Sequence, residues 1–220
     1  MEILGTEILS NLLYLIAQSL FIPVIIVVLV FITYAVLSLG SFLTEKFSRI
    51  KFDVNKTEKL IRAISKSSNP EEMKEKVCES QLQDKYKKII IKIISNHDIG
   101  PQSRRAIAIK LIEEEELQFS TITQKTDILV RLAPTVGLLG TLIPLGPGLS
   151  ALGAGDINSL AQSLMVAFDT TITGLAAGSI GFIISRYRKK WYTDELSILE
   201  AIVESTLEAL DNVQEKTIFR

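Results

Sequence analysis

A strongly apolar stretch in the last third of the chain carries a carboxylate and several hydroxyls. Its sequence is VAFDTTITGLAAGSIGF, residues 166–182, and its polar side chains are those of Asp169, Thr170, Thr171 and Thr173. An aspartate at the centre of a bilayer costs about 2.5–3.5 kcal/mol on insertion scales, so an ionisable group there indicates a function. Hydroxyl and carboxylate oxygens can replace part of an ion's hydration shell. If the stretch crosses a membrane, these residues therefore predict an ion pathway.

The spacing of these residues divides them between faces of a helix. At about 100° per residue, Asp169 and Thr173 share a face, so the carboxylate can accept a hydrogen bond from the Thr173 hydroxyl or from a neighbouring subunit. Thr170, Gly174 and Gly178 form a small-xxx-small ridge, which lets a neighbouring backbone approach closely. We expect this ridge to hold subunits together.

A second apolar stretch, residues 132–152, carries a hydroxyl near its middle, that of Thr141. Thr141 lies about 15 Å from Arg131 along a helix. Thr171 lies about 22 Å from Arg186, so the two hydroxyls can reach overlapping depths. Alternatively, each threonine bonds to the backbone of its own helix, as is common. For the cluster as a whole we favour a water-filled or partner-lined path.

Three stretches are long and apolar enough to place these residues in a membrane. The 47% of hydrophobic residues are gathered in blocks rather than spread along the chain. A transmembrane helix needs about 20 apolar residues, and the sequence predicts three, at residues 19–43, 129–152 and 160–185. The first is not a cleavable signal peptide, because nothing basic precedes it and its apolar run is too long.

The basic residues predict the orientation of these helices. Every Lys and Arg lies in residues 46–131 or 186–220. Short cytoplasmic segments collect Lys and Arg, whereas translocated segments exclude them. We therefore expect a multi-pass protein of the cytoplasmic (inner) cell membrane, with the N-terminus outside and the C-terminus in the cytoplasm.

The remaining segments are also predicted to be helical, so the expected fold class is an all-α membrane protein. Residues 1–18 form an amphipathic helix for the outer membrane surface, before Pro23 redirects the chain. Residues 44–128 form a cytoplasmic helical domain, and residues 186–220 form a cytoplasmic C-terminal helix. A helix that starts near Gln102 is expected to continue unbroken into the second membrane segment as a stalk.

Two local patterns refine the cytoplasmic part. Asn69 is expected to cap a helix that starts at Pro70. The C-terminal helix carries an apolar seam with steps of three and four residues, interrupted only by Thr206. The seam can pack on the stalk of the same subunit or between subunits, and the sequence leaves both open. Its members are Leu196, Leu199, Val203, Leu210 and Val213.

Few residues outside the membrane stretches could carry other chemistry. The net charge of −1 leaves no basis for nucleic-acid binding. Cys78 has no cysteine partner, and His97 is expected in a turn or at a helix end. Glu113–Glu116 spread around a helix as a solvated surface and do not converge on a metal. We expect no enzyme activity, no metal site and no cofactor.

Two motifs resemble the MotA/TolQ/ExbB proton-channel family. They are TDILVRLAPTVGLLGTL, residues 126–142, and AFDTTITGLAAGSIGFIISRY, residues 167–187. The family's second helix carries an APxxGLLGT motif, and its last helix carries a threonine three residues before a Gly-Leu pair. The topology is similar to that of the ExbB and TolQ members. The matching residues are Ala133, Pro134, Gly137, Leu138, Leu139, Gly140 and Thr141, then Thr171, Gly174 and Leu175.

The resemblance implies a ring-forming homo-oligomer, a pentamer that surrounds two copies of a smaller single-span partner of the ExbD/TolR/MotB kind. The partner would bring the ion-carrying aspartate, and ion flow would rotate one ring against the other. Thr141 and Thr171 would line the pore, and membrane lipid would surround the ring. The residues expected to pack the helices are Gly137, Gly140, Gly174 and Gly178.

The sequence departs from the family pattern at two places. In ExbB and TolQ a glutamate lies five residues before the threonine, but here Val166 stands at that position. Asp169 cannot replace this glutamate, because it points about 160° away from Thr171. Pro144 and Pro147 predict that the second membrane helix breaks early.

The resemblance therefore implies the pore-forming subunit of an ion-driven membrane motor, which couples ion flow to mechanical work through a single-span partner. The resemblance also favours protons as the ion. Sodium, coordinated by Asp169 beside Thr170 and Thr171, is the alternative, and Asp169 could also relay protons or link subunits. The competing function is a structural membrane scaffold that clusters a partner without conducting ions. A solute transporter is disfavoured because three helices show no inverted repeat.

Overall fold

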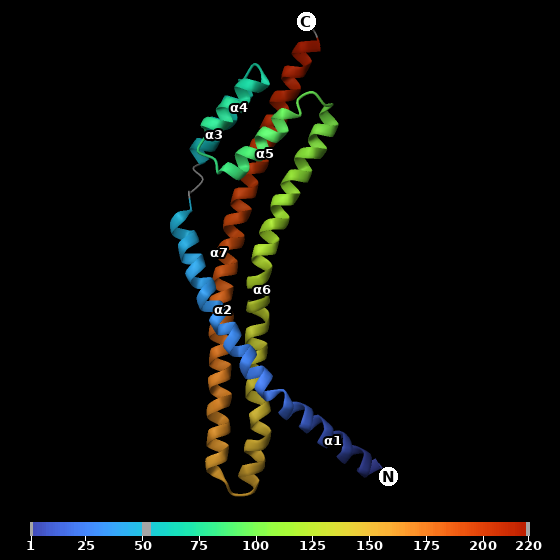
Figure 1. Ribbon diagram of the computed structural model, residues 1–220, viewed down its shortest axis with the longest axis vertical. Helices are drawn as coiled ribbons and strands as arrows, with labels where there is room; N and C mark the ends of the chain where they lie inside the picture. The colour runs from blue at the N-terminus through green and yellow to red at the C-terminus, as the bar shows by residue number, and fades with distance from the viewer. Residues whose placement is uncertain (1, 50–53, 219–220) are drawn as a thin grey trace. The chain divides into compact units, whose positions relative to one another are not determined.

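Seven helices make up the described part of the chain, residues 2–49 and 54–218, in this computed structural model (Figure 1). No strand occurs in these residues. Three helical stretches are long and apolar enough to cross a membrane. The predicted fold class, an all-α membrane protein, is confirmed. The helices are α1 (Glu2–Ser19), α2 (Phe21–Ser48), α3 (Val54–Ser65), α4 (Pro70–Glu79), α5 (Asp84–Ser95), α6 (Pro101–Gly153) and α7 (Ile157–Ile218).

The chain divides into two compact units. Unit 1 consists of residues 1–48 and 123–187, and unit 2 consists of residues 49–122 and 188–220. Helices α6 and α7 contribute to both units. As predicted, α6 starts beside Gln102 and runs without a break into the second apolar stretch.

The first long apolar helix begins where α1 ends. Leu20 separates α1 from α2, and Pro23 occupies the third position of α2, where its missing N–H removes no bond within that helix. The break between the two helices therefore falls at Leu20, three residues before Pro23. The side chains of residues 1–6 lie outside the described residues. Several apolar side chains of α1 are exposed, among them those of Ile8, Leu12, Leu15 and Ile16.

In unit 1, α2 packs over one side of the pair that α6 and α7 form. Ala35 of α2 is fully buried in a cluster with small or medium-sized side chains of the pair. Phe31 and Ile32 of α2 and Ile180 of α7 extend this contact. The other buried members are Leu129, Ala133 and Ala177.

Three prolines lie inside α6. The helix includes Pro134, Pro144 and Pro147 and continues to Gly153, so the predicted early break is wrong. A proline inside a soluble helix costs about 3 kcal/mol or more. Membrane helices tolerate proline because neighbouring helices and side chains satisfy the freed backbone groups. Pro134 packs closely on α7: a Cβ placed on Gly178 would lie 2.7 Å from its Cγ.

A short turn joins α6 to α7. Gly155 has φ of 83°, in the left-handed region that favours glycine. Asp156 then accepts hydrogen bonds from Ser159, at 3.1 Å from the backbone nitrogen and 2.5 Å from the hydroxyl. These bonds hold the pKa of the Asp156 carboxyl below its ordinary value. Asp156 therefore caps the start of α7.

Unit 2 has a core of large side chains. Helix α5 brings Ile90, Ile93 and Ile94, all fully buried, against α6 and α7. The predicted seam of α7 lies in this core, so it packs within one chain, the first of the two alternatives. Thr206, which interrupts the seam, is fully buried and donates to the Ile202 carbonyl at 2.7 Å.

The predicted cap of α4 is confirmed. The Asn69 side-chain oxygen accepts a hydrogen bond from the Glu72 backbone nitrogen at 2.8 Å. In return, the Glu72 carboxylate accepts one from the Ser68 backbone nitrogen at 2.9 Å. These bonds satisfy N–H groups that have no partner within the helix.

Two predictions for isolated polar residues have different outcomes. His97 lies in the turn after α5, as expected. The four glutamates of α6 are not uniformly solvated, because Glu115 is only 7% exposed and its carboxylate lies 3.3 Å from the Lys85 ammonium. Glu115 faces α5 because four successive residues cover every side of a helix.

A buried carboxylate of α7 links α5 and Arg49, the residue that follows α2. Glu195 accepts hydrogen bonds from Arg49 at 2.9 and 2.6 Å and from the Tyr86 hydroxyl at 2.6 Å. The Arg49 guanidinium also lies 4.7 Å from the centre of the Trp191 ring. Burial, and the bond to Glu195, raise the pKa of Tyr86 well above its ordinary value. Unit 2 therefore contains a satisfied polar group inside an apolar core.

Candidate functional site: the polar flank of the membrane helix pair

The candidate site is built on a glycine contact between α6 and α7. A Cβ placed on Gly174 would lie 2.6 Å from the Ala133 carbonyl oxygen and 2.8 Å from the Gly137 Cα. Real Cβ atoms do not approach backbone this closely, so the two helices touch at their backbones. Only a glycine at position 174 permits this close approach of the two helices.

Two further contacts lie on either side of this glycine contact. Pro134 meets Gly178 on one side, and Thr170 meets Gly140 on the other, where an added Cβ would lie 2.6 Å from the Thr170 hydroxyl. All four predicted packing glycines therefore lie between helices of the same chain. The expectation that the ridge of α7 joins subunits is wrong, because α6 of the same chain already fills it.

These contacts define two flanks of the helix pair. We call the side of Pro134 and Gly178 the open flank and the opposite side the α2 flank. On α6, measured from Gly137, Pro134 points to about +60° and Ala133 to about −40°. The α2 flank carries Ala133 and Ala177, against which α2 packs.

Thr141 and Thr171 lie together on the open flank. Thr141 points to about +40° from Gly137, and Thr171 points to about +60° from Gly174 on the antiparallel helix. The Thr171 hydroxyl donates across the helix pair to the Gly137 carbonyl at 3.3 Å. The Thr141 hydroxyl donates within its own helix to the Leu138 carbonyl at 2.6 Å. Both side chains are half-buried.

The sequence left open that each threonine hydroxyl bonds to the backbone of its own helix. This holds for Thr141 and not for Thr171. A hydroxyl has one proton but two lone pairs, so each oxygen can still accept a hydrogen bond from a passing group. Leu138 and Leu175, which lie beside them, are 55% and 52% exposed in the single chain. The flank is therefore accessible within one chain.

Thr170 does not belong to this flank. It is only 8% exposed, and its hydroxyl donates to the carbonyls of Val166 at 3.0 Å and Ala167 at 2.9 Å. Its methyl and hydroxyl groups fill the space beside Gly140. Thr170 is therefore a packing residue in this chain.

Asp169 lies away from the two flank threonines. It points to about −140° from Gly174, on the side of the α2 flank, and its side chain is exposed. The Thr173 hydroxyl donates to the Asp169 backbone carbonyl at 2.7 Å, and not to the carboxylate as expected. The structure therefore does not bring Asp169, Thr170 and Thr171 together as an ion-coordinating group.

Asp127 and Ser185 form a polar pair that the sequence reasoning missed. The Ser185 hydroxyl donates across the helix pair to the Asp127 carboxylate at 2.5 Å. Asp127 points to about +80° from Gly137, which places it on the open flank. It lies 14 residues before Thr141, and Ser185 lies 14 residues after Thr171, about 21 Å along each helix. These equal spacings were the signal available in the sequence.

In the described ranges, no three His, Cys, Asp or Glu side chains gather so that they could hold a metal ion. The polar groups of the open flank are hydroxyls, with one carboxylate at its end. Such a set can pass or position an ion.

Together these features define a class: a three-helix membrane protein whose glycine-packed helix pair carries a polar flank. The model of the MotA/TolQ/ExbB proton channel family matches residues 69–201. That match covers more than half of the chain, and the protein belongs to this family. It is therefore a multi-pass membrane protein of a family of ion-driven membrane complexes, and this family consists of proton channels rather than enzymes.

The chain is also similar to a protein from Methanothermobacter thermautotrophicus that bears the name of a biopolymer transport protein ExbB homolog. The two sequences are 29% identical over 190 residues, which cover 80% of this chain. The matched region spans 65% of the length of that relative.

Proposed function

We propose that this protein is the pore-forming subunit of an ion-driven membrane motor, which couples ion flow to mechanical work through a single-span partner. Family membership supports an ion-driven complex in general. The observation that carries the specific proposal is the open flank, where Thr141 and Thr171 lie on the side of the helix pair that α2 does not cover.

In a ring of these chains, the open flank would line the ion path. We propose a pentamer in which the open flanks face the interior and α2 lies toward lipid. The interior would hold two copies of a partner of the ExbD/TolR/MotB kind, with an acidic residue on its membrane helix. The threonine oxygens would then supply hydrogen bonds to the ion that this acid carries.

The Asp127–Ser185 pair extends the proposed path. It lies about 21 Å from the threonines on the same flank, toward the end of the span where Arg186 and the following basic residues begin. A carboxylate there can accept a proton that has already travelled from the threonines to the cytoplasmic end of the path. We propose Asp127 as the group at the cytoplasmic mouth of the path.

The proposed ion is the proton. Sodium binding needs several converging oxygens, and Thr170 is buried in packing while Asp169 points to another side. Single hydroxyls and one carboxylate suit proton transfer. We propose that Asp169 has a structural or subunit-linking role.

The proposed location is the cytoplasmic (inner) membrane, with the N-terminus outside and the C-terminus inside. The distribution of Lys and Arg supports this orientation. The amphipathic helix α1 would then lie on the outer surface, and unit 2 would lie in the cytoplasm.

The test is proton flux into vesicles that contain the protein with its single-span partner, identified by co-purification. Thr141→Val and Thr171→Val keep the shape and remove the oxygen, so each should lower flux at least tenfold with assembly intact. Thr135→Val is the matched control, because Thr135 is exposed and bonds to its own helix at the Arg131 carbonyl. Normal conduction by both flank variants would contradict the proposal.

Paired aspartate variants separate the two carboxylates. Asp127→Asn should reduce flux strongly because an amide cannot take up the proton, whereas Asp169→Asn should leave flux unchanged. Loss of flux only in Asp169→Asn would move the path to the α2 flank. Complexes that assemble with the partner but never conduct would favour the scaffold.

A further inference from the structure

Helix α7 carries an acidic stripe in unit 2. Residues 191–215 contain no Lys or Arg. The acidic side chains follow steps of three and four residues, so they occupy one face of the helix. We call this set the α7 stripe. Its members are Glu200, Glu204, Glu208, Asp211 and Glu215.

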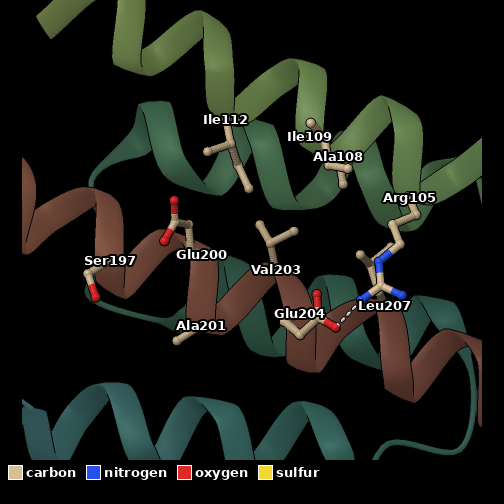
Figure 2. A pocket seen from close by; sticks show the side chains of 10 residues that line it. All are labelled: Arg105, Ala108, Ile109, Ile112, Ser197, Glu200, Ala201, Val203, Glu204 and Leu207. Carbon is tan, nitrogen blue, oxygen red and sulfur yellow. Dashed lines mark hydrogen bonds and ion pairs between the residues drawn. The ribbon is translucent and has the colours of Figure 1, made fainter.

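The stripe borders a groove between α6 and α7 (Figure 2). The groove has a volume of about 430 Å³ and an apolar lining that includes Ile112, Val203 and Leu207. Ile109, at its edge, is 52% exposed. In Figure 2 Arg105 reaches over the groove toward Glu204. An apolar groove with an acidic border fits a basic helix whose side chains have long apolar stems.

The stripe is incompletely neutralised within one chain. Arg105 pairs with Glu204 at 2.5 Å, and Arg104 pairs with Asp211 at 2.6 Å. In the described ranges, no ion pair involves Glu200 or Glu208. Like charges four residues apart destabilise a helix, so this face gains from a cationic partner.

Basic residues with matching spacing lie on α3 of the same unit and directly after it. Lys56, Lys59, Arg62 and Lys66 recur at steps of three and four residues; the first three lie on α3, and Lys66 lies in the turn that follows its last residue, Ser65. We call these four residues the α3 face. Lys59 and Lys66 are exposed, and neither forms an ion pair with a described residue. Seven residues separate Lys59 from Lys66, which corresponds to about 10 Å at the rise of a helix, and Glu200 and Glu208 lie about 12 Å apart along α7.

We propose that the groove between α6 and α7 of one subunit, with its acidic border, receives the α3 face of a second copy of this chain. The contact would be head to tail, because the acidic and basic surfaces differ, and such a contact closes into a ring when its rotation permits. The Lys59 and Lys66 stems cover Ile109 and the groove, and their ammonium groups pair with Glu208 and Glu200. This inference rests on the ring of the proposed function, and it assigns the surface that joins its cytoplasmic units.

Charge reversal in the full chain tests this contact. Glu200→Lys with Glu208→Lys, and separately Lys59→Glu with Lys66→Glu, should each lower the ring fraction at least threefold in mild detergent, measured by native mass spectrometry. The chain with all four changes should recover the ring, because the charges are exchanged. Glu75→Lys with Glu79→Lys, on exposed positions of α4, is the control and should leave the ring intact.

Cysteine cross-linking is a second test, which does not require any charge to be reversed. In a Cys78→Ser background, Glu208→Cys with Lys59→Cys should give a ladder of disulfide-linked species up to the full ring. The control pair, Glu208→Cys with Glu79→Cys, should stay monomeric on a denaturing gel. The absence of a ladder, or a disulfide confined to one chain, overturns the proposal.

Other outcomes also decide the matter. Rings that survive both reversals overturn the proposal. Loss of the single-span partner alone in the Glu200→Lys/Glu208→Lys chain assigns the groove to that partner and also overturns it. Because ring assembly is measured without ion flux, a failed motor function would appear separately, as intact rings that do not conduct protons.

Discussion

Unit 1 and unit 2 hold α6 and α7 together in different ways. In unit 1 the helices meet at Gly137 and Gly174, and no larger residue fits at Gly174. In unit 2 the same two helices meet through side chains such as Leu111 and Leu199, with a carboxylate, Glu195, buried among them. One pair of helices therefore changes its packing chemistry along its length.

This difference in packing follows from the solvent, because helix packing in lipid and helix packing in water are stabilised by different forces. Lipid tails are as apolar as leucine, so burying leucine between membrane helices yields little, and close backbone contact supplies the attraction instead. In water, burying apolar surface is worth about 25 cal/mol per Å², so large aliphatic side chains stabilise unit 2. The stability of unit 1 should therefore fall when a larger side chain is introduced between its helices. The stability of unit 2 should fall when a buried side chain loses its hydrogen-bond or packing partner.

Removal of the buried carboxylate should have the largest effect on stability. Glu195→Ala leaves the Arg49 guanidinium and the Tyr86 hydroxyl without this acceptor, and breaking a buried pair costs about 3–5 kcal/mol. Thermal unfolding of the full chain in mild detergent measures the loss. Glu204→Ala is the control, because its pair with Arg105 is exposed and worth at most about 1 kcal/mol. Equal losses in the two variants would contradict the role of burial.

A single added methyl group should be the next largest perturbation. Gly174→Ala places a Cβ against the Ala133 carbonyl and the Gly137 Cα, and overpacking of this kind costs about 1–3 kcal/mol. Gly146→Ala lies in the same α6 segment with nothing within 4 Å, so it should be neutral or slightly stabilising. Unfolding temperatures in detergent compare the two. A harmless Gly174→Ala would mean that the helices do not touch at this point.

Alkaline pH should weaken unit 2 through Tyr86. Its pKa is raised in the folded chain by burial and by Glu195, whereas an unfolded tyrosine ionises near 10.0. Above that pH the unfolded state loses a proton that the folded state retains. Stability is therefore complete below pH 10 and falls above it by up to about 1.4 kcal/mol per pH unit.

Tyr86→Phe supplies the comparison for this effect. It loses one hydrogen bond to Glu195, so its stability at neutral pH should be lower by about 1–3 kcal/mol. Its decline between pH 10 and 11 should be shallower than that of the unmodified chain. Parallel declines would assign the alkaline effect to other groups.

Of the four perturbations, the loss of a helix cap should have the smallest effect on stability. Asn69→Ala removes the side-chain oxygen that accepts from the Glu72 backbone nitrogen, which costs about 1 kcal/mol. Ser68→Ala is the control, because Ser68 takes part in this cap through its backbone nitrogen. Thermal unfolding should separate the two variants; identical unfolding temperatures would contradict the cap's contribution.

The sequence by itself determined the features that depend on neighbours along the chain. Runs of apolar residues predict the spans, Asn69 and Pro70 predict the start of α4, and the break before Gln102 predicts the start of α6. Membership of the family also follows from a contiguous motif around Gly137. Such features depend on local hydrogen bonding and hydropathy, which a linear pattern records.

Only the tertiary structure decided which faces meet. It placed Thr141 and Thr171 on one flank, buried Thr170 against Gly140, and used the ridge of α7 within one chain. It kept α6 helical through Pro144 and paired Asp127 with Ser185 across two helices. A helix wheel gives the direction of each side chain about one axis, but contact between residues far apart in sequence depends on the relative rotation and register of two helices. That rotation is set by the close approach of Gly137 and Gly174, which no single segment specifies.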